Sequence, residues 1–257
     1  MENIVMITGA TSGIGKATAL QFAELGYNLI LCGRRTERLE ALAKELTEAH
    51  GISVCCLTFD VRSESEVQAA LNSLSDEWRQ IEILVNNAGL AMGLAEFHES
   101  DLNHWNTMID TNVKGLLNVS RAVSPQMVTN KRGHIINVCS TAGHEVYPKG
   151  HVYCATKHAV DAITKGMRLD LHKYNIKVSQ VSPAHVEETE FAEVRFEGNK
   201  KKAKIYEDFN PLKSSDVAEL IVFMATRPPH VNIQDILVMG TQQANSTHID
   251  RSGRLHD

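Results

Sequence analysis

Short apolar runs alternate with longer amphipathic segments along most of the chain. The apolar runs predict buried strands at residues 4–7, 28–32, 53–58, 81–85, 134–139 and 176–181. The segments between them predict helices at residues 13–25, 36–50, 64–78, 105–130 and 152–174. Strands that are apolar on both faces and separated by helices are typical of βαβ units. The pattern therefore predicts an α/β fold over residues 1–257, a single-domain Rossmann-type doubly wound parallel sheet with helices on both faces.

The periodic pattern weakens after Pro183. Residues 184–213 are polar and carry lysines at 200–202 and 204. A segment of this length inside a compact α/β domain is more often a functional lid than a plain connection, so we expect a substrate lid there. The lysines are interpreted as a solvated face, because no aromatic residues are interleaved with them. The polar tail at 247–257 is expected to be either disordered or an intersubunit contact.

Composition narrows the classes of function. The chain has 31 acidic residues against 26 Lys and Arg, a net charge of −5, which argues against nucleic acid or an anionic membrane as the main partner. No apolar run is long enough to span a bilayer, and the N-terminus does not look like a signal peptide. The five cysteines are odd in number and lie mostly in apolar runs. A disulfide framework is therefore not expected, the cytoplasm is the simplest compartment, and no metal site is expected.

A glycine-rich turn separates the first predicted strand from the first predicted helix. It comprises Thr8, Gly9, Ala10, Thr11, Ser12, Gly13, Ile14 and Gly15. Glycines allow positive φ and a close approach of the backbone to a phosphate, and a helix N-terminus supplies N–H groups and a positive dipole end. The spacing differs from the usual dinucleotide fingerprint, and a tight turn without a ligand is the alternative. Its place between strand and helix favours a dinucleotide site.

The end of the second predicted strand bears on which dinucleotide binds. An NAD site carries an acidic residue there, which accepts hydrogen bonds from the ribose. This chain has Arg34 and Arg35 instead, and the first acid, Glu37, falls inside the next helix. Guanidinium groups match the geometry of a phosphate, such as the 2′-phosphate that distinguishes NADP from NAD. The sequence therefore favours NADP(H) as cofactor.

Three polar residues later in the chain suggest acid–base chemistry. Tyr153 and Lys157 are four residues apart in a predicted helix and so project from one face. An ammonium group beside a phenol lowers the pKa of the phenol, which makes it usable as an acid or base near neutral pH. Ser140 ends a predicted strand, at the edge of the sheet where α/β active sites collect. The predicted catalytic chemistry is proton transfer at this edge.

The motifs together carry a family resemblance. The glycine turn, Ser140 and the Tyr153/Lys157 pair are joined, in a regular order, by Asp60-Val61, Asn86-Asn87-Ala88-Gly89 and Asn112. In these residues the chain resembles the short-chain dehydrogenase/reductase family over essentially its whole length. It is similar in particular to NADP-dependent 3-hydroxy acid dehydrogenases, in the segments 86–93, 108–112, 189–196 and 229–233. The resemblance implies hydride transfer between a nicotinamide and a 3-hydroxy acid of the serine, allo-threonine or 3-hydroxypropionate/malonic semialdehyde type.

The resemblance also implies roles for the catalytic residues. Ser140 would hydrogen-bond the substrate oxygen, and Tyr153 would exchange its proton. Lys157 would hold the nicotinamide ribose and keep Tyr153 acidic. Asn112 would anchor a water that links Lys157 to solvent. Arg195, in the predicted lid, is the candidate for binding the substrate carboxylate, and the alternative is that it pairs with a neighbouring glutamate, Glu193 or Glu197, on the surface.

The implied cofactor site spans most of the chain. Asp60 and Val61 would contact adenine, Asn87 its ribose, and residues 183–191 would cover the nicotinamide. The complete expected set is Gly9, Ala10, Thr11, Ser12, Gly13, Ile14, Gly15, Arg34, Arg35, Asp60, Val61, Asn87, Ala88, Gly89, Tyr153, Lys157, Pro183, Val186 and Thr189. One departure is Ala184, where the family usually has glycine after the proline. We expect a modest effect of this alanine on cofactor geometry.

Two other functions are compatible with these residues. The chain could be a general NADPH-dependent carbonyl reductase of the same family that acts on neutral aldehydes, ketones or diketones. It could also be a catalytically silent NADP(H)-binding regulator, against which the complete catalytic set argues. The family is commonly tetrameric, so a homotetramer is implied, in which the helices at 105–130 and 152–174 face each other across two-fold axes.

Overall fold

The computed structural model describes residues 3–199 and 207–254, so the lysines at 200–202 and 204 lie outside the described residues. The strands are β1 (Ile4–Thr8), β2 (Asn28–Gly33), β3 (Val54–Thr58), β4 (Ile81–Asn86), β5 (Gly133–Val138), β6 (Ile176–Pro183) and β7 (Asp235–Val238). The helices are α1 (Gly13–Glu24), α2 (Thr36–His50), α3 (Glu64–Asn72), α4 (Leu102–Ile109), α5 (Leu116–Asn130), α6 (His151–Leu171), α7 (Phe191–Arg195) and α9 (Ser214–Ala225).

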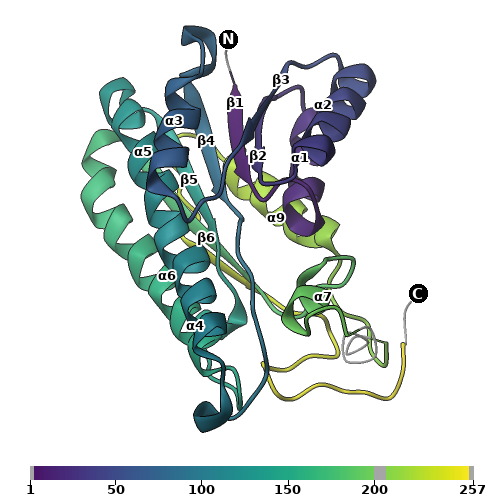
Figure 1. The fold of residues 1–257 in the computed structure, drawn as a ribbon. Coiled ribbons are helices and arrows are strands. Elements are labelled where there is room, and N and C mark those ends of the chain that lie inside the picture. Colours follow the sequence, from purple (N-terminus) through teal and green to yellow (C-terminus); the bar gives the residue numbers. More distant parts are fainter. Residues whose placement is uncertain (1–2, 200–206, 255–257) are drawn as a thin grey trace.

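The strands form one parallel sheet in the order β3-β2-β1-β4-β5-β6-β7. The chain runs outward from β1 to β3 and then returns to the other side of β1 to begin β4 (Figure 1). The loops after β1 and β4 therefore leave the sheet in opposite directions. In open α/β sheets this switch in direction opens a crevice at the carboxyl ends of the strands, and ligands bind there.

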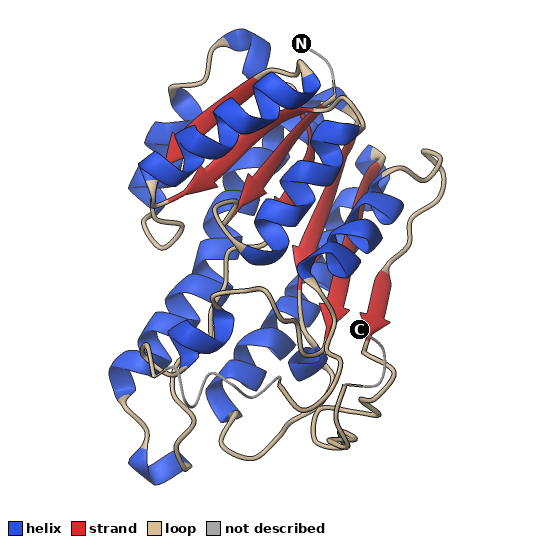
Figure 2. Cartoon of the chain, turned by 90° about the vertical axis from the view of Figure 1, so that its right-hand side faces the viewer, coloured by secondary structure: helices blue, strands red, loops and turns tan. Residues whose placement is uncertain are grey.

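Helices cover the sheet on both faces (Figure 2). Alternate residues of one strand point to opposite faces, so β1 contributes to two separate cores. Val5 and Ile7 pack with residues of α1, α2 and α9 on one face, whereas Ile4 and Met6 pack with residues of α3 and α5 on the other. Burial on both faces explains why the strands are continuously apolar in the sequence. The predicted fold class is confirmed.

All six predicted strands are present, with ends within two residues of the predicted ones. The seventh strand, β7, was not predicted. It lies at the edge of the sheet beside β6, and its side chains alternate between exposed and half-buried. A four-residue edge strand with this pattern has little apolar signal to distinguish it from a loop.

Two predicted helices differ from the observed ones. The first, at 64–78, ends at Asn72, and a short 3₁₀ turn, Asp76–Trp78, follows. The second, at 105–130, is interrupted by a π-helical turn, Asp110–Gly115, between α4 and α5. At the end of this turn the backbone of Gly115 lies against Val61, so close that a Cβ would be 2.6 Å from a Val61 methyl carbon. Such widened turns are frequent at functional sites.

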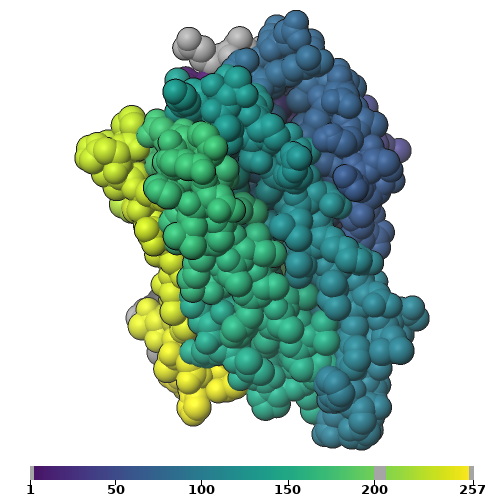
Figure 3. Space-filling model, turned by 90° about the vertical axis from the view of Figure 1, so that its left-hand side faces the viewer, coloured from purple at the N-terminus to yellow at the C-terminus, as the bar shows by residue number. Residues whose placement is uncertain are grey.

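Helices α4, α5 and α6 form one outer face of the molecule, coloured teal to green in Figure 3. Several of its large apolar side chains are exposed, namely Leu102, Ile109, Leu117 and Leu169. Within residues 3–199 and 207–254, no helix is both long and apolar enough to cross a membrane.

Candidate active site

A cavity of about 670 Å³ opens at the carboxyl edge of the sheet. Its wall contains most of the residues that the sequence predicted for the site: Gly9, Thr11, Ser12, Gly13, Ile14, Arg34, Arg35, Asp60, Val61, Asn87, Ala88, Gly89, Ser140, Tyr153, Lys157, Pro183, Val186, Thr189 and Arg195. Ala10, Gly15 and Asn112 are not part of this wall. The fold thus brings seven separated segments of the chain to one place, at residues 9–14, 34–35, 60–61, 87–89, 140, 153–157 and 183–195.

Ala10 and Gly15 support the cavity from behind. Ala10 is fully buried, and its N–H donates to the carbonyl of Cys32 in β2 at 3.1 Å. A Cβ at Gly15 would lie 2.3 Å from the carbonyl oxygen of Gly9 and 2.5 Å from Nδ2 of Asn87. Glycine is therefore required at position 15 for packing of α1 against the turn, and its contact with a cofactor stays a prediction.

The glycine turn has the features of an anion site. Gly9 and Gly13 have φ of +66° and +50°, which only glycine adopts readily. Ser12 is the N-cap of α1, but its side chain makes no capping hydrogen bond. The first N–H groups of α1 therefore have no capping side chain and adjoin the cavity. This arrangement and the cavity volume fit the pyrophosphate of a dinucleotide.

Arg35 connects the glycine turn to the predicted lid. Its Nε and one terminal nitrogen donate to Oγ1 of Thr11 at 3.1 and 2.6 Å. Its other terminal nitrogen donates to both carboxylate oxygens of Glu190 at 2.9 and 2.7 Å. Arg38 donates to the same carboxylate at 2.6 Å. Sequence reasoning missed Glu190, because nothing in the sequence near residue 190 indicates a contact with residue 35.

Arg34 points elsewhere, and its side chain is 64% exposed. It lies 3.9 Å from Asp60, which also forms an ion pair of 2.6 Å with Arg62. Burial alone would raise the pKa of Asp60, but hydrogen bonds and charge from Arg62 lower it. Although the sequence has no acid beside these arginines at the end of β2, the fold brings Asp60 to Arg34 and Glu190 to Arg35.

Tyr153 and Lys157 lie on α6 and are both buried at the cavity. Nζ of Lys157 is 5.9 Å from the centre of the Tyr153 ring and donates to the carbonyl of Val138 at 2.9 Å. Burial raises the pKa of Tyr153 far above its usual range. The net shift is therefore upward in this structure, and the lowering of this pKa by Lys157 stays a prediction. Burial also lowers the pKa of Lys157 itself.

Several neighbouring side chains also shift the pKa of Tyr153. Beside burial, Tyr147 raises its pKa, whereas a hydrogen bond with Ser140 and the charge of Arg195 lower it. Ser140 and Arg195 therefore favour the phenolate, the form that accepts a proton. The two groups that stabilise this form are the ones that the sequence assigned to substrate binding.

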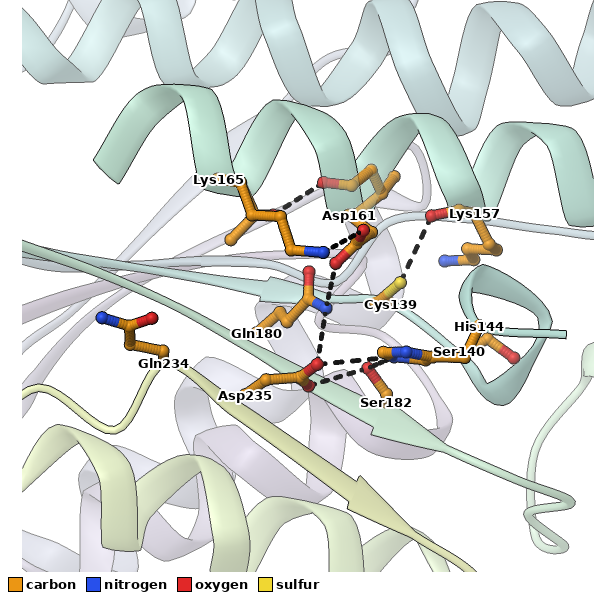
Figure 4. A network of polar contacts seen from close by, with 12 residues as sticks. Cys139, Ser140, His144, Lys157, Asp161, Lys165, Gln180, Ser182, Gln234 and Asp235 are labelled. Atoms are coloured by element: carbon orange, nitrogen blue, oxygen red, sulfur yellow. Dashed lines mark hydrogen bonds and ion pairs between the residues drawn. The ribbon is translucent and has the colours of Figure 1, made fainter. Parts of the chain in front are cut away.

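Ser140 begins a short turn that a polar network holds in place (Figure 4). Its Oγ accepts a hydrogen bond from the N–H of Ala142 at 3.1 Å. His144, at the end of this turn, lies 3.0 Å from Oγ of Ser182 and 3.4 Å from a carboxylate oxygen of Asp235. Ser182 donates to Asp235 at 3.1 Å. Residues of β6 and β7 thus fix the loop that positions Ser140.

The same network reaches α6. Gln180 donates to Asp161 at 2.9 Å and to Asp235 at 3.0 Å, which ties α6 to β6 and β7 (Figure 4). The thiol of Cys139 donates to the backbone carbonyl of Lys157 at 3.4 Å. The segments that carry Ser140 and Lys157 are therefore joined by side chains behind the cavity.

Asn112 lies in the π-helical turn and is almost fully buried. Its side chain exchanges two hydrogen bonds of 2.8 Å with the backbone of Leu90 and donates to Thr156 at 3.1 Å. A Cβ at Gly89 would lie 3.3 Å from the Asn112 oxygen and 3.6 Å from Nζ of Lys157. Asn112 thus holds the loop after β4 next to Lys157. Its implied role as the anchor of a water stays a prediction.

Arg195 ends α7 and is only 9% exposed. One terminal nitrogen donates to the hydroxyl of Tyr147 at 3.2 Å, and the guanidinium carbon lies 6.0 Å from the centre of the Tyr153 ring. Its Nε is buried and has no hydrogen-bond partner among the described residues. The alternative of a surface pair is wrong: Arg195 is buried, and Glu197 pairs with His104 instead.

The described part of the predicted lid covers the glycine turn. Thr189 lies over Gly13, where a Cβ would be 3.0 Å from its methyl carbon, and Val186 pairs with Leu212 in a β-bridge. The N–H of Ala184 donates to Val238 at 2.9 Å, and its φ is outside the left-handed region. The backbone reason for expecting an effect of this alanine therefore does not apply.

Residues 247–254 of the tail pack against the lid of their own chain. Arg254 pairs with Glu187, Arg251 pairs with Asp208, and the N–H of Gly253 donates to the carbonyl of Asp208 at 3.1 Å. Disorder is therefore wrong for this part of the tail, and an intersubunit contact stays a prediction. Arg251 and Tyr147 also line the cavity, and sequence reasoning missed both because they reach it only through the fold.

Comparisons with known proteins agree with this geometry. The model of the short chain dehydrogenase family matches residues 3–200. The chain is 45% identical over 242 residues to the NADP-dependent 3-hydroxy acid dehydrogenase YdfG of Salmonella typhi, covering 94% of this chain and 96% of the relative. It is 45% identical over 254 residues to sulfoacetaldehyde reductase 2 of Chromohalobacter salexigens, covering 98% and 100%.

A solved structure is also similar along nearly the whole chain. The closed form of a serine dehydrogenase complexed with NADP+ superposes with a TM-score of 0.90 at 42% identity, covering 95% of this chain and 97% of the other. With the family model, the relatives and the site in agreement, the chain belongs to the short chain dehydrogenase family. Enzymes of this family carry out oxidation and reduction at a carbon that bears oxygen.

Proposed function

We propose that this protein is an NADP-dependent oxidoreductase that acts on a 3-hydroxy acid or the corresponding carbonyl compound. The observation that carries the proposal is Arg195, a buried cation beside Tyr153 whose Nε has no partner within the described chain. A buried charge without an anionic partner is costly to the folded protein, so a substrate anion is its natural partner. The relative named for 3-hydroxy acids supports this substrate class, and the relative named for sulfoacetaldehyde likewise acts on a compound with an acid group.

Ser140, Tyr153 and Arg195 have separate roles in the proposed reaction. The hydroxyl of Ser140, whose oxygen already accepts from Ala142, donates to the substrate oxygen. Tyr153 takes the hydroxyl proton in oxidation and returns it in reduction. Arg195 binds the acid group and sets the distance from that group to the reacting carbon. NADP(H) held by these residues would provide the hydride acceptor in oxidation and the hydride donor in reduction.

NADP fits the adenine end of the cavity. The glycine turn would hold the pyrophosphate, and Arg34 and Arg35 would bind the 2′-phosphate. Asp60, Val61 and Asn87 would line the adenosine, and Lys157 would hold the nicotinamide ribose. Residues 183–191 would cover the nicotinamide, as part of a substrate lid at about 184–213. The NADP dependence of the YdfG relative supports this choice.

Assembly and compartment are further parts of the proposal. We infer a homotetramer, supported by the exposed apolar side chains Leu102, Ile109, Leu117 and Leu169 on the face of α4, α5 and α6. We infer the cytoplasm as the compartment, supported by five cysteines that are all free thiols in the fold.

A substrate panel tests the function. The panel contains serine, allo-threonine, 3-hydroxypropionate, sulfoacetaldehyde, and neutral alcohols, aldehydes and diketones, each assayed with NADP(H) and NAD(H). We expect the highest kcat/KM for a carboxylate with NADP(H). Preference for the sulfonate would keep Arg195 as the anion site but change the acid class. Preference for neutral compounds would instead identify a general carbonyl reductase, and no turnover of any compound would favour a regulator.

A further inference from the structure

Glu190 joins the lid to the adenine end of the cavity. It directly precedes α7, and its carboxylate receives two hydrogen bonds from Arg35 and one from Arg38. Burial alone would raise the pKa of Glu190, but the hydrogen bonds and charges of the two arginines lower it. The carboxylate is therefore ionised at neutral pH and sits as a fixed anion between two guanidinium groups.

Arg35 binds the glycine turn as well as the carboxylate of Glu190. The remaining nitrogens of Arg35 donate to Thr11 and Ser12 in the glycine turn, at distances from 2.6 to 3.2 Å. Arg35 and the three residues that it contacts line the cavity, at the end proposed for the adenosine half of the dinucleotide. A carboxylate and a phosphate bind a guanidinium through the same fork geometry, so both compete for the same N–H donors.

We propose that Glu190 is an internal competitor of the 2′-phosphate and so sets how strongly the enzyme prefers NADP over NAD. The proposal rests on the proposed use of NADP and deepens it. When NADP binds, the phosphate takes donors of Arg35 that Glu190 holds, and the two anions repel each other. When NAD binds, no phosphate reaches Arg35, and the contacts of Glu190 remain. The carboxylate therefore weakens NADP binding and leaves NAD binding nearly unchanged.

One variant of Glu190 distinguishes this role from the opposite one, in which Glu190 strengthens NADP binding. If Glu190 instead served to orient Arg35 for the phosphate, removal of its charge would weaken NADP binding. The variant Glu190→Gln keeps the size and the hydrogen-bonding oxygen of the side chain but removes the charge. The two roles therefore predict changes of opposite sign in one dissociation constant.

The experiment measures the dissociation constants of NADP+ and NAD+ by isothermal titration calorimetry, without substrate and at low ionic strength. For Glu190→Gln we expect NADP+ to bind about three- to tenfold more tightly, in keeping with a partly exposed ion pair. NAD+ should bind within about twofold of the unmutated protein, since no phosphate reaches Arg35. Glu193→Gln is the matched control, because it removes the same charge from an exposed residue of α7, the helix that Glu190 directly precedes.

A double-mutant cycle localises the effect. In an Arg35→Ala background, Glu190→Gln should tighten NADP+ binding less than in the unmutated protein, because the competition for Arg35 is gone and only the repulsion between the two anions remains. Weaker NADP+ binding by Glu190→Gln, no change, or an equal gain for both cofactors would each overturn the inference. Failure of the proposed cofactor preference would show in the unmutated protein as equal dissociation constants, whereas failure of this inference shows only in the Glu190 variant.

Discussion

The two ends of the cavity each contain an arginine, and the two differ in their surroundings. At the adenine end, the side chain of Arg35 is 39% exposed and donates to Thr11, Ser12 and Glu190. At the substrate end, Arg195 is 9% exposed and donates to Tyr147, while its Nε has no partner among the described residues. One cation is partly exposed and all its nitrogens have partners, and the other is buried and incompletely paired.

The difference in burial indicates at which end binding of an anion contributes more free energy. An exposed ion pair is screened by water and contributes little, about 0–1 kcal/mol. A buried charge gains more from a correct partner, because water does not compete and the unpaired state is costly. We therefore expect changes at the substrate end to affect catalysis more strongly than changes at the adenine end affect cofactor binding.

The largest effect should come from Tyr153, which lies beside Arg195 at the substrate end. Tyr153→Phe removes one hydroxyl and with it the proton transfer, so kcat should fall by about 10²- to 10⁴-fold. Cofactor binding, measured by calorimetry, should stay unchanged because the ring is retained. A loss of less than about tenfold would show that another group moves the proton.

Arg195 should give the next largest effect, and only for acids. Arg195→Met keeps much of the buried side-chain volume but removes the charge, so kcat/KM for 3-hydroxypropionate should fall about ten- to a hundredfold. Neutral carbonyl substrates should be almost unaffected. If both kinds of substrate lose equally, Arg195 shapes the cavity but does not bind the acid group.

Substitutions at the adenine end should change kcat/KM less than those at the substrate end. Arg35→Ala should lower kcat/KM with NADP by about tenfold, from the loss of one charge-assisted hydrogen bond, and Arg34→Ala should act in the same direction. Neither variant should weaken turnover with NAD. Equal efficiency of the unmutated enzyme with both cofactors would contradict the assignment of these arginines to the 2′-phosphate.

The smallest expected effect is a shift of the pH profile of kcat/KM. Burial raises the pKa of Tyr153, and the charge of Arg195 opposes this rise. Oxidation needs the deprotonated form of Tyr153, so kcat/KM for an alcohol should rise with pH toward the pKa of this group. Arg195→Met removes the opposing charge, so this limb of the pH profile should move to higher pH. A limb at unchanged pH, measured with a neutral alcohol, would show that Arg195 does not act on Tyr153.

The sequence predicted those parts of the molecule that depend on local pattern. Buried strands such as β1 and β4 are continuously apolar, and Tyr153 and Lys157 share a helix at a spacing that puts them on one face. Most predicted positions of the glycine turn and the strand ends line the cavity, because the carboxyl edge of a parallel sheet collects the loops that follow its strands.

The features that the sequence did not predict depend on contacts between distant segments. Glu190 reaches Arg35 across 155 positions, and Arg195 reaches Tyr147 across 48. The rise in the pKa of Tyr153 follows from burial by the assembled fold, which overrides the simple expectation from the neighbouring Lys157. The edge strand β7 lacks a buried apolar run, and its position depends on pairing with β6 and on contacts with distant residues, so the local sequence pattern did not reveal it.

The central claim is that Arg195 binds the acid group of the substrate beside Tyr153. A crystal structure of the dead-end complex with NADPH and 3-hydroxypropionate tests it most directly, because the reduced cofactor and the alcohol do not react with each other. We predict that the carboxylate is within hydrogen-bond distance of Nε of Arg195 and that the hydroxyl lies between Ser140 and Tyr153. A carboxylate directed away from Arg195, with the hydroxyl still at Tyr153, would contradict the account.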